Sequence, residues 1–147
     1  MRTALALAAL SVVALAASAT AAPSAGFKIC GQIKHGPFLR WTLALPGQKP
    51  IRLHGTTWTV VARGAVPCGT ATTIGHMLLE KFPASLKTLT HQIKPTPKGF
   101  DICSSEAKNG QVSCYDLKHD RNVTLWQTDP LTLAQVKQIA ATGVIGG

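Results

Sequence analysis

The sequence has few acidic residues and few aromatic ones. Its 147 residues include 6 Asp and Glu against 15 Lys and Arg, a formal net charge of +9, and aromatic side chains make up 5%. Glu80 is the only acid before residue 101, so the paired carboxylates that glycosidases use would have to come from a very small set. The 13 Gly and 9 Pro disfavour a long coiled coil, and an ordinary apolar fraction with 3 Trp disfavours disorder.

Several catalytic and metal-binding motifs are also missing. The sequence has no His-Glu-x-x-His, which excludes a zincin at motif level, and no Gly-x-Ser-x-Gly, so the nucleophile elbow is absent. The five histidines are spread over predicted strands, loops and a helix, at His35, His54, His76, His91 and His119. We therefore assign no catalytic, cofactor-binding or metal-binding residue, and the sequence favours a protein without enzymatic activity.

The start of the chain is typical of a secretory signal peptide. Met1 and Arg2 precede an apolar run over residues 4–17, and small residues follow up to Ala22. The pattern predicts a signal peptide over residues 1–22, cut after Ala21 or Ala22, and a single exported α+β domain over residues 23–147. No later stretch approaches the length of a spanning helix, so no integral membrane span is expected after cleavage, and the domain is expected to be secreted or held in the cell envelope. An uncleaved anchor is the alternative.

The chain has four cysteines, and an even number in an exported domain of this size indicates two disulfides rather than a zinc site. Cys103 and Cys114 flank a turn, and a four-residue loop over residues 107–110 would place these two cysteines directly opposite each other. That register leaves Cys30 to pair with Cys68. The alternative, Cys68 with Cys114 and Cys30 with Cys103, stays open.

The pattern of apolar residues predicts a small disulfide-stapled α+β domain. Antiparallel strands would pack with one central helix, a second group of strands would follow, and a C-terminal helix would end the domain. Trp41 and Trp58 alternate with apolar neighbours and are predicted in the core, whereas the position of Trp126 stays open. Asp129 is predicted to cap the last helix, with Pro130 as its first residue and Gly143 just after its end. The expected strands are Phe27–Ile33, Phe38–Leu45, Thr56–Arg63, Phe100–Ser104, Gln111–Asp116 and Asn122–Gln127, and the expected helical segments are Cys68–Phe82, a short turn within Ser85–Ile93, and residues 131–140.

The chain contains four short motifs, which follow one another in the order Gly55-Thr-Thr-Trp58-Thr-Val60, Val66-Pro67-Cys68-Gly69-Thr70-Ala71, Gly99-Phe100-Asp101-Ile102-Cys103 and Val112-Ser113-Cys114. In this order the motifs resemble those of small exported actinobacterial proteins that contain disulfides. The resemblance covers roughly Cys30–Trp126 and departs from the usual pattern at Pro67 and Gly69, in the first turn of the central helix. It implies a disulfide-containing exported domain and carries no established activity.

The positive charge is concentrated in one part of the chain. Residues 23–100 carry ten Lys and Arg against Glu80 alone, whereas residues 101–147 are close to neutral. This asymmetry favours an exported basic domain that binds an anionic polymer or an acidic protein through residues 23–100. Charge spread evenly for solubility is the alternative. The candidate contacts are Lys28, Lys34, Arg40, Arg52, Arg63, Lys94 and Lys98.

Two other functions stay open. Loops held by disulfides would suit a secreted inhibitor of a hydrolase. A small basic hydrolase resembling a ribonuclease would need a general base, a general acid and cations for the phosphate, which Glu80, His76, His119 and Arg121 could supply if the fold brought them together. Three Trp on strands could also form an aromatic face for a ligand.

Overall fold

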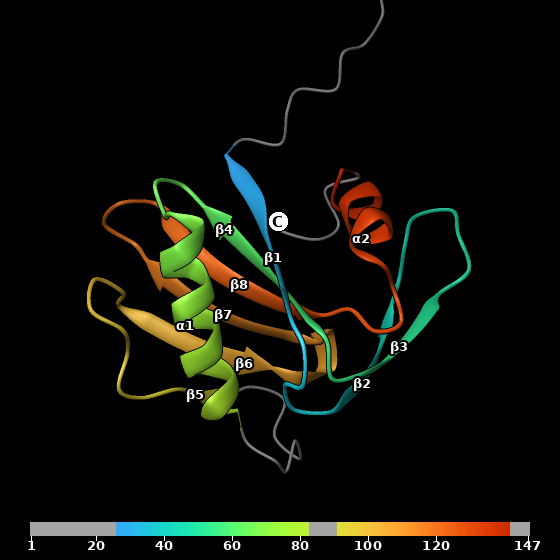
Figure 1. Cartoon of the computed structure of the whole chain (residues 1–147), viewed down its shortest axis with the longest axis horizontal. Helices are drawn as coiled ribbons and strands as arrows, with labels where there is room; N and C mark the ends of the chain where they lie inside the picture. The colour runs from blue at the N-terminus through green and yellow to red at the C-terminus, as the bar shows by residue number, and fades with distance from the viewer. Residues whose placement is uncertain (1–25, 83–90, 142–147) are drawn as a thin grey trace, which may run out of the picture.

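The computed structural model describes residues 26–82 and 91–141, which form an α+β domain of antiparallel strands and two helices (Figure 1). A six-stranded sheet has the order β1-β4-β8-β7-β6-β5, and a separate two-stranded sheet is formed by β2 and β3. The elements are β1 Phe27–Ile33, β2 Leu39–Leu43, β3 Ile51–Gly55, β4 Trp58–Arg63, α1 Cys68–Glu80, β5 His91–Gln92, β6 Ile102–Glu106, the 3-10 turn Ala107–Asn109, β7 Gln111–Asp116, β8 Arg121–Gln127 and α2 Leu133–Ala140.

Strands from both predicted groups join in the large sheet, whereas β2, from the first group, lies in the small one. Strand β8 pairs with β7 on one side and with β4 on the other, with Val60 opposite Leu125 at the centre of the β4–β8 pair. Most residues of both strands are buried, so the pair lies in the core of the domain. The sequence could not show this pairing, since it joins strands that are far apart in the chain.

Helix α1 crosses one face of the large sheet (Figure 1). The helix begins at Cys68 although Pro67 and Gly69 occupy its start, and the Ala71 N–H donates to the Pro67 carbonyl at 2.9 Å. Gly75 faces the sheet, where a Cβ would lie only 3.0 Å from Ile33. Glycine at position 75 therefore lowers the intrinsic stability of the helix, but it lets the helix pack closely against the sheet.

Strands β2 and β3 form a hairpin at one end of the large sheet (Figure 1). The β2 prediction was too long at both ends, and β3 was not predicted at all. Strand β3 is only five residues long and follows Pro50, so its alternation is too brief to be recognised without its partner. The inner side chains of the hairpin, Trp41 and Leu53, are buried. Burial of Trp41 confirms the predicted core position.

The two disulfides confirm the favoured pairing. Cys30 is bonded to Cys68, and Cys103 to Cys114. Cys103 lies directly opposite Cys114 in the β6–β7 register, as the four-residue loop predicted. The alternative pairing is wrong.

The predicted start of the C-terminal helix is wrong. Helix α2 begins at Leu133, and Thr132 is its N-cap in a capping box with Gln135. The Asp129 carboxylate instead accepts hydrogen bonds from the backbone N–H groups of Thr56 and Thr57, both at 2.7 Å. Asp129 therefore has a long-range role that competes with local capping.

Three predictions fall partly or wholly beyond the described ranges. The signal peptide over residues 1–22 and Gly143 lie outside them, as does most of the predicted turn within Ser85–Ile93. At the described end of that segment, His91 and Gln92 form strand β5 rather than helix. Among residues 26–82 and 91–141, no helix has the length and apolar character to cross a bilayer.

Candidate functional site

The outer side of the β2–β3 hairpin is exposed and basic. Because side chains alternate along a strand, burial of Trp41 and Leu53 turns their neighbours outward. In the register Arg40 lies opposite His54, and Thr42 lies opposite Arg52. We call these four residues the hairpin face. Together with Trp41 they line a groove of about 450 Å³.

The cations of the hairpin face have no carboxylate partner. Within the described parts of the chain, no Asp or Glu oxygen lies within 4.0 Å of the side-chain nitrogens of Arg40 or Arg52. The Arg40 guanidinium instead lies 5.8 Å from the centre of the Phe38 ring, at the start of β2. Both arginines can therefore bind an anion without first breaking an ion pair.

The far end of β3 is fixed by Asp129. The backbone N–H of His54 donates to the Asp129 carbonyl oxygen at 2.9 Å, next to the two bonds that the Asp129 carboxylate accepts. Burial alone would raise the pKa of Asp129, but the hydrogen bonds from Thr57 and Thr56 outweigh it and lower the pKa below its usual value. The backbone beside His54 is thus held by a charged group that stays ionised.

The other candidate contacts do not share this groove. Arg63, on β4, lies 3.8 Å from Asp120 and is already paired. Lys28 is exposed on β1, and Lys94 and Lys98 are exposed in the loop that follows β5. Of the seven predicted contacts, the structure therefore brings only Arg40 and Arg52 together in one groove.

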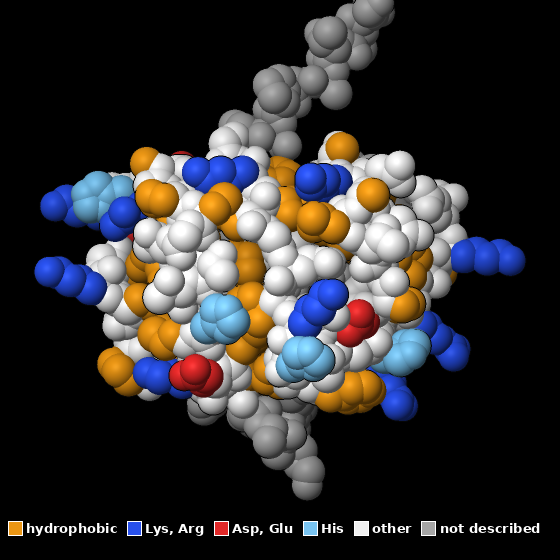
Figure 2. Space-filling view, viewed as in Figure 1, with side chains coloured by type: hydrophobic (Ala, Val, Ile, Leu, Met, Phe, Trp, Pro, Cys, Tyr) orange, Lys and Arg blue, Asp and Glu red, His pale blue; other side chains and the backbone are white. Residues whose placement is uncertain are grey.

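Lys34 lines a second cavity, between the β1–β2 connection and the last turns of α1. This cavity of about 420 Å³ is also lined by His35, His76 and Glu80. In Figure 2, histidine side chains (pale blue) lie across the molecule with Lys and Arg (blue), and Asp and Glu (red) are sparse. His76 and Glu80 thus share a cavity, with neither His119 nor Arg121 in its lining.

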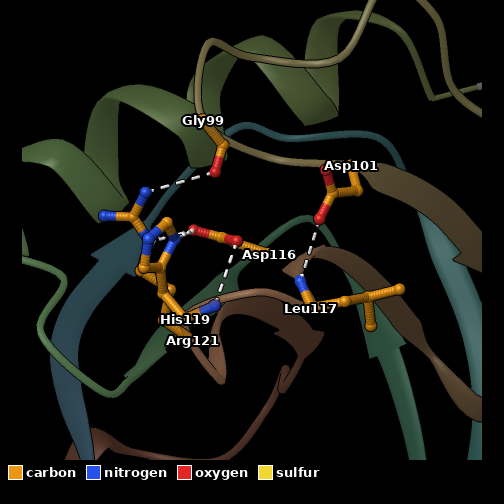
Figure 3. A network of polar contacts seen from close by, with 6 residues as sticks. All are labelled: Gly99, Asp101, Asp116, Leu117, His119 and Arg121. Carbon is orange, nitrogen blue, oxygen red and sulfur yellow. Dashed lines mark hydrogen bonds and ion pairs between the residues drawn. The ribbon is translucent and has the colours of Figure 1, made fainter.

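His119 and Arg121 belong to a separate polar cluster at the β7–β8 turn (Figure 3). His119 Nδ1 and Arg121 Nε lie 2.7 Å and 2.6 Å from the same carboxylate oxygen, Oδ2 of Asp116. Arg121 also donates to the Gly99 carbonyl at 3.2 Å. The four residues proposed for a ribonuclease-like site are therefore divided between two places.

Asp116 is the buried centre of that cluster, with 4% of its surface exposed. Its burial would raise its pKa, but hydrogen bonds from Arg121 and His119 lower the pKa to about 2. Asp116 could not be recognised from the sequence, because nothing in the local pattern separates a buried acid at a strand end from an exposed one. The contacts of Asp116 stabilise the β7–β8 turn, and the bond from Arg121 to the Gly99 carbonyl fixes the loop before β6. The role of this cluster is therefore structural.

All three tryptophans are buried in the structure. Trp41, Trp58 and Trp126 are 8%, 0% and 7% exposed, so the alternative of a tryptophan ligand face is wrong. In the described ranges, no three His, Cys, Asp or Glu side chains are grouped closely enough to hold a metal ion.

Comparison with protein-family models, with curated proteins and with solved structures found no match. The function of this chain is therefore inferred from its own residues.

Proposed function

We propose that this chain is an exported, non-enzymatic domain of the cell envelope or extracellular space that binds an anionic polymer through its hairpin face. The observation that carries the proposal is the groove that Arg40, Arg52 and His54 line, in which the two arginines lie exposed and have no carboxylate partner among the described residues. Arginines without a carboxylate partner attract polyanions strongly, because no charge of the protein neutralises them. Their planar guanidinium groups can also donate paired hydrogen bonds to phosphate oxygens.

The hairpin supports this role because it is anchored to the large sheet. Trp41, on the inner side of the hairpin, donates from its indole nitrogen to the backbone carbonyl of Gln127 at 2.9 Å. The rings of Trp41 and Trp126 pack with their centres 5.8 Å apart. A fixed support lowers the ordering cost of binding, which leaves more of the electrostatic attraction as affinity.

An exported location is supported by two features of the chain. The domain has two disulfides, and disulfides form and persist in oxidising surroundings. The first 22 residues have the sequence pattern of a signal peptide. An anionic polymer of the envelope or the medium would then be the partner that the hairpin face meets.

The proposal is tested by comparing two double variants with the same change in net charge. Arg40→Gln with Arg52→Gln removes the cations of the hairpin face, whereas Lys94→Gln with Lys98→Gln removes two exposed cations of the loop after β5. Binding of linear polyphosphate is measured by titration calorimetry at several salt concentrations. Each phosphate contact with a single-stranded nucleic acid contributes about 0.7 to the slope of log K against log salt concentration. If that value is taken for polyphosphate, the slope should fall by roughly 1.4 in the arginine variant and change very little in the lysine variant.

Two outcomes would overturn the proposal. If both double variants weaken binding equally, the attraction comes from diffuse charge rather than from the hairpin face. If the wild-type protein binds polyphosphate with no dependence on salt, the hairpin face is not a site for anionic polymers.

A further inference from the structure

Phe38 is an exposed aromatic ring beside the hairpin face. Its exposed fraction is 56%, and it directly precedes Leu39, which is 4% exposed and turned inward. Phe38 and Arg40 are therefore on the same side of the chain, as the 5.8 Å between the ring centre and the guanidinium carbon also indicates. More than half of the ring is thus exposed beside an arginine that has no carboxylate partner among the described residues.

The chain just before Phe38 is held firmly. The Trp58 indole donates to the Pro37 carbonyl oxygen at 2.9 Å, and the Gly36 N–H donates to the Thr56 carbonyl at 2.9 Å. A Cβ on Gly36 would lie 2.5 Å from the Trp58 ring, so only glycine lets the segment pack this closely. The backbone that presents Phe38 is thereby fixed on the core, and the ring is offered to solvent from a defined position.

Cations lie on both sides of Phe38 along the chain. Arg40 and Arg52 line the groove on one side, where they are diagonal neighbours with roughly 7 Å between their Cα atoms. On the other side, Lys34 lines the second cavity, which extends up to Pro37. A flexible polyanion could thus contact positive charge before and after the ring, although Glu80 on the wall of the second cavity weakens the attraction there.

We propose that the anionic polymer is a single-stranded nucleic acid, with neighbouring phosphates on Arg40 and Arg52 and one base stacked on Phe38. This inference rests on the proposed function and names the class of its partner. Single-stranded nucleic acids are bound by positive grooves with aromatic rings on which bases stack, and arginine next to such a ring adds a cation–π contribution. A polyanion without bases would use the arginines but would leave Phe38 without a partner.

The experiment compares two strands that differ only in their bases. A fluorescent oligothymidine and an abasic oligomer of the same length carry the same phosphates, and their binding to the full protein is measured by fluorescence anisotropy. Stacking of one base should make the oligothymidine bind about tenfold more tightly than the abasic oligomer. Phe38→Ala should remove that difference between the two oligomers, and Phe38→Trp should keep it. Ile102→Ala, at another exposed apolar residue, should not change the binding of either oligomer.

The outcomes separate this inference from the proposed function. If both oligomers bind equally and both need Arg40 and Arg52, the base-stacking inference is overturned and the polyanion function stands. The base-stacking inference is also overturned, and the polyanion function also stands, if polyphosphate binds and neither oligomer does. The same two conclusions follow if duplex DNA binds more tightly than the single strand. If polyphosphate and both oligomers all fail to bind, the inference and the proposed function are both overturned.

Discussion

The indole nitrogen of Trp41 lies 2.9 Å from Oε1 of Gln127, at the end of β8, and both side chains are buried. This hydrogen bond joins the small sheet to the large one. The hairpin face therefore owes its position to a side chain that points the opposite way, into the protein.

Trp41→Phe should weaken the attachment of the hairpin. The substitution keeps an aromatic ring but leaves the buried acceptors of Gln127 without their donor, so the free energy of unfolding should fall by roughly 1–3 kcal/mol. Urea denaturation would measure the change. Thr42→Ala, at the exposed neighbouring position, is the control and should change stability by less than about 0.5 kcal/mol; equal effects of the two variants would contradict the role given to Trp41.

Gly110→Ala should also be destabilising, for two reasons that act together. Gly110 has φ of 63°, which favours glycine, and an added Cβ would overlap the Trp41 indole. We expect a loss of roughly 1–3 kcal/mol in denaturant unfolding. Gly69→Ala is a matched control, since Gly69 lies in α1 with no atom near the new Cβ, and this change should be neutral or stabilising.

The two disulfides should differ in their contribution to stability. They close loops with sequence separations of 38 and 11 residues, and constraint of the unfolded chain grows slowly with loop length. Replacing Cys30 and Cys68 by Ala should cost about 4 kcal/mol, and replacing Cys103 and Cys114 about 3 kcal/mol. Unfolding in urea of the two double variants would compare them, and a clearly larger loss for the Cys103–Cys114 pair would contradict the loop-length account.

Acid should destabilise the protein through Asp116. Its pKa is about 2 in the folded protein, below the value of about 3.9 for an unfolded Asp. The stabilisation is therefore complete above pH 4 or so and is lost as the pH falls from about 4 toward 2. We expect Asp116→Asn to lower the Tm at pH 7 and to lose less further stability than the wild type across that interval.

Asp120→Asn provides the control for the acid experiment. Asp120 is 88% exposed, and its φ of 45° is one that Asn also tolerates. This variant should follow the wild-type Tm at every pH. If Asp116→Asn also follows the wild type across the acid range, the network around Asp116 does not govern acid stability.

Parts of the fold were predictable because a local pattern determined them. The turn between β6 and β7 determines its own register, so the position of Cys103 opposite Cys114 followed from loop length. Trp58 was recognised as a core residue by its alternation with Val60 and Ala62, and it is fully buried.

The candidate site was less predictable because it depends on which strands become neighbours. Arg40 and Arg52 are separated by a loop in the chain, and only the register of β2 with β3 places them in one groove. Asp129 was misinterpreted for a related reason, since its local pattern is that of a helix cap and its partners lie more than seventy residues earlier.

The pairing of β4 with β8 has a consequence for the integrity of the chain. One disulfide lies wholly before residue 69 and the other wholly after residue 102, so neither bridges these two strands. A single proteolytic cut between Cys68 and Cys103 would therefore produce two fragments with no covalent link. Hydrogen bonds and side-chain packing between β4 and β8, together with the contacts of α1, would decide whether the fragments stay associated.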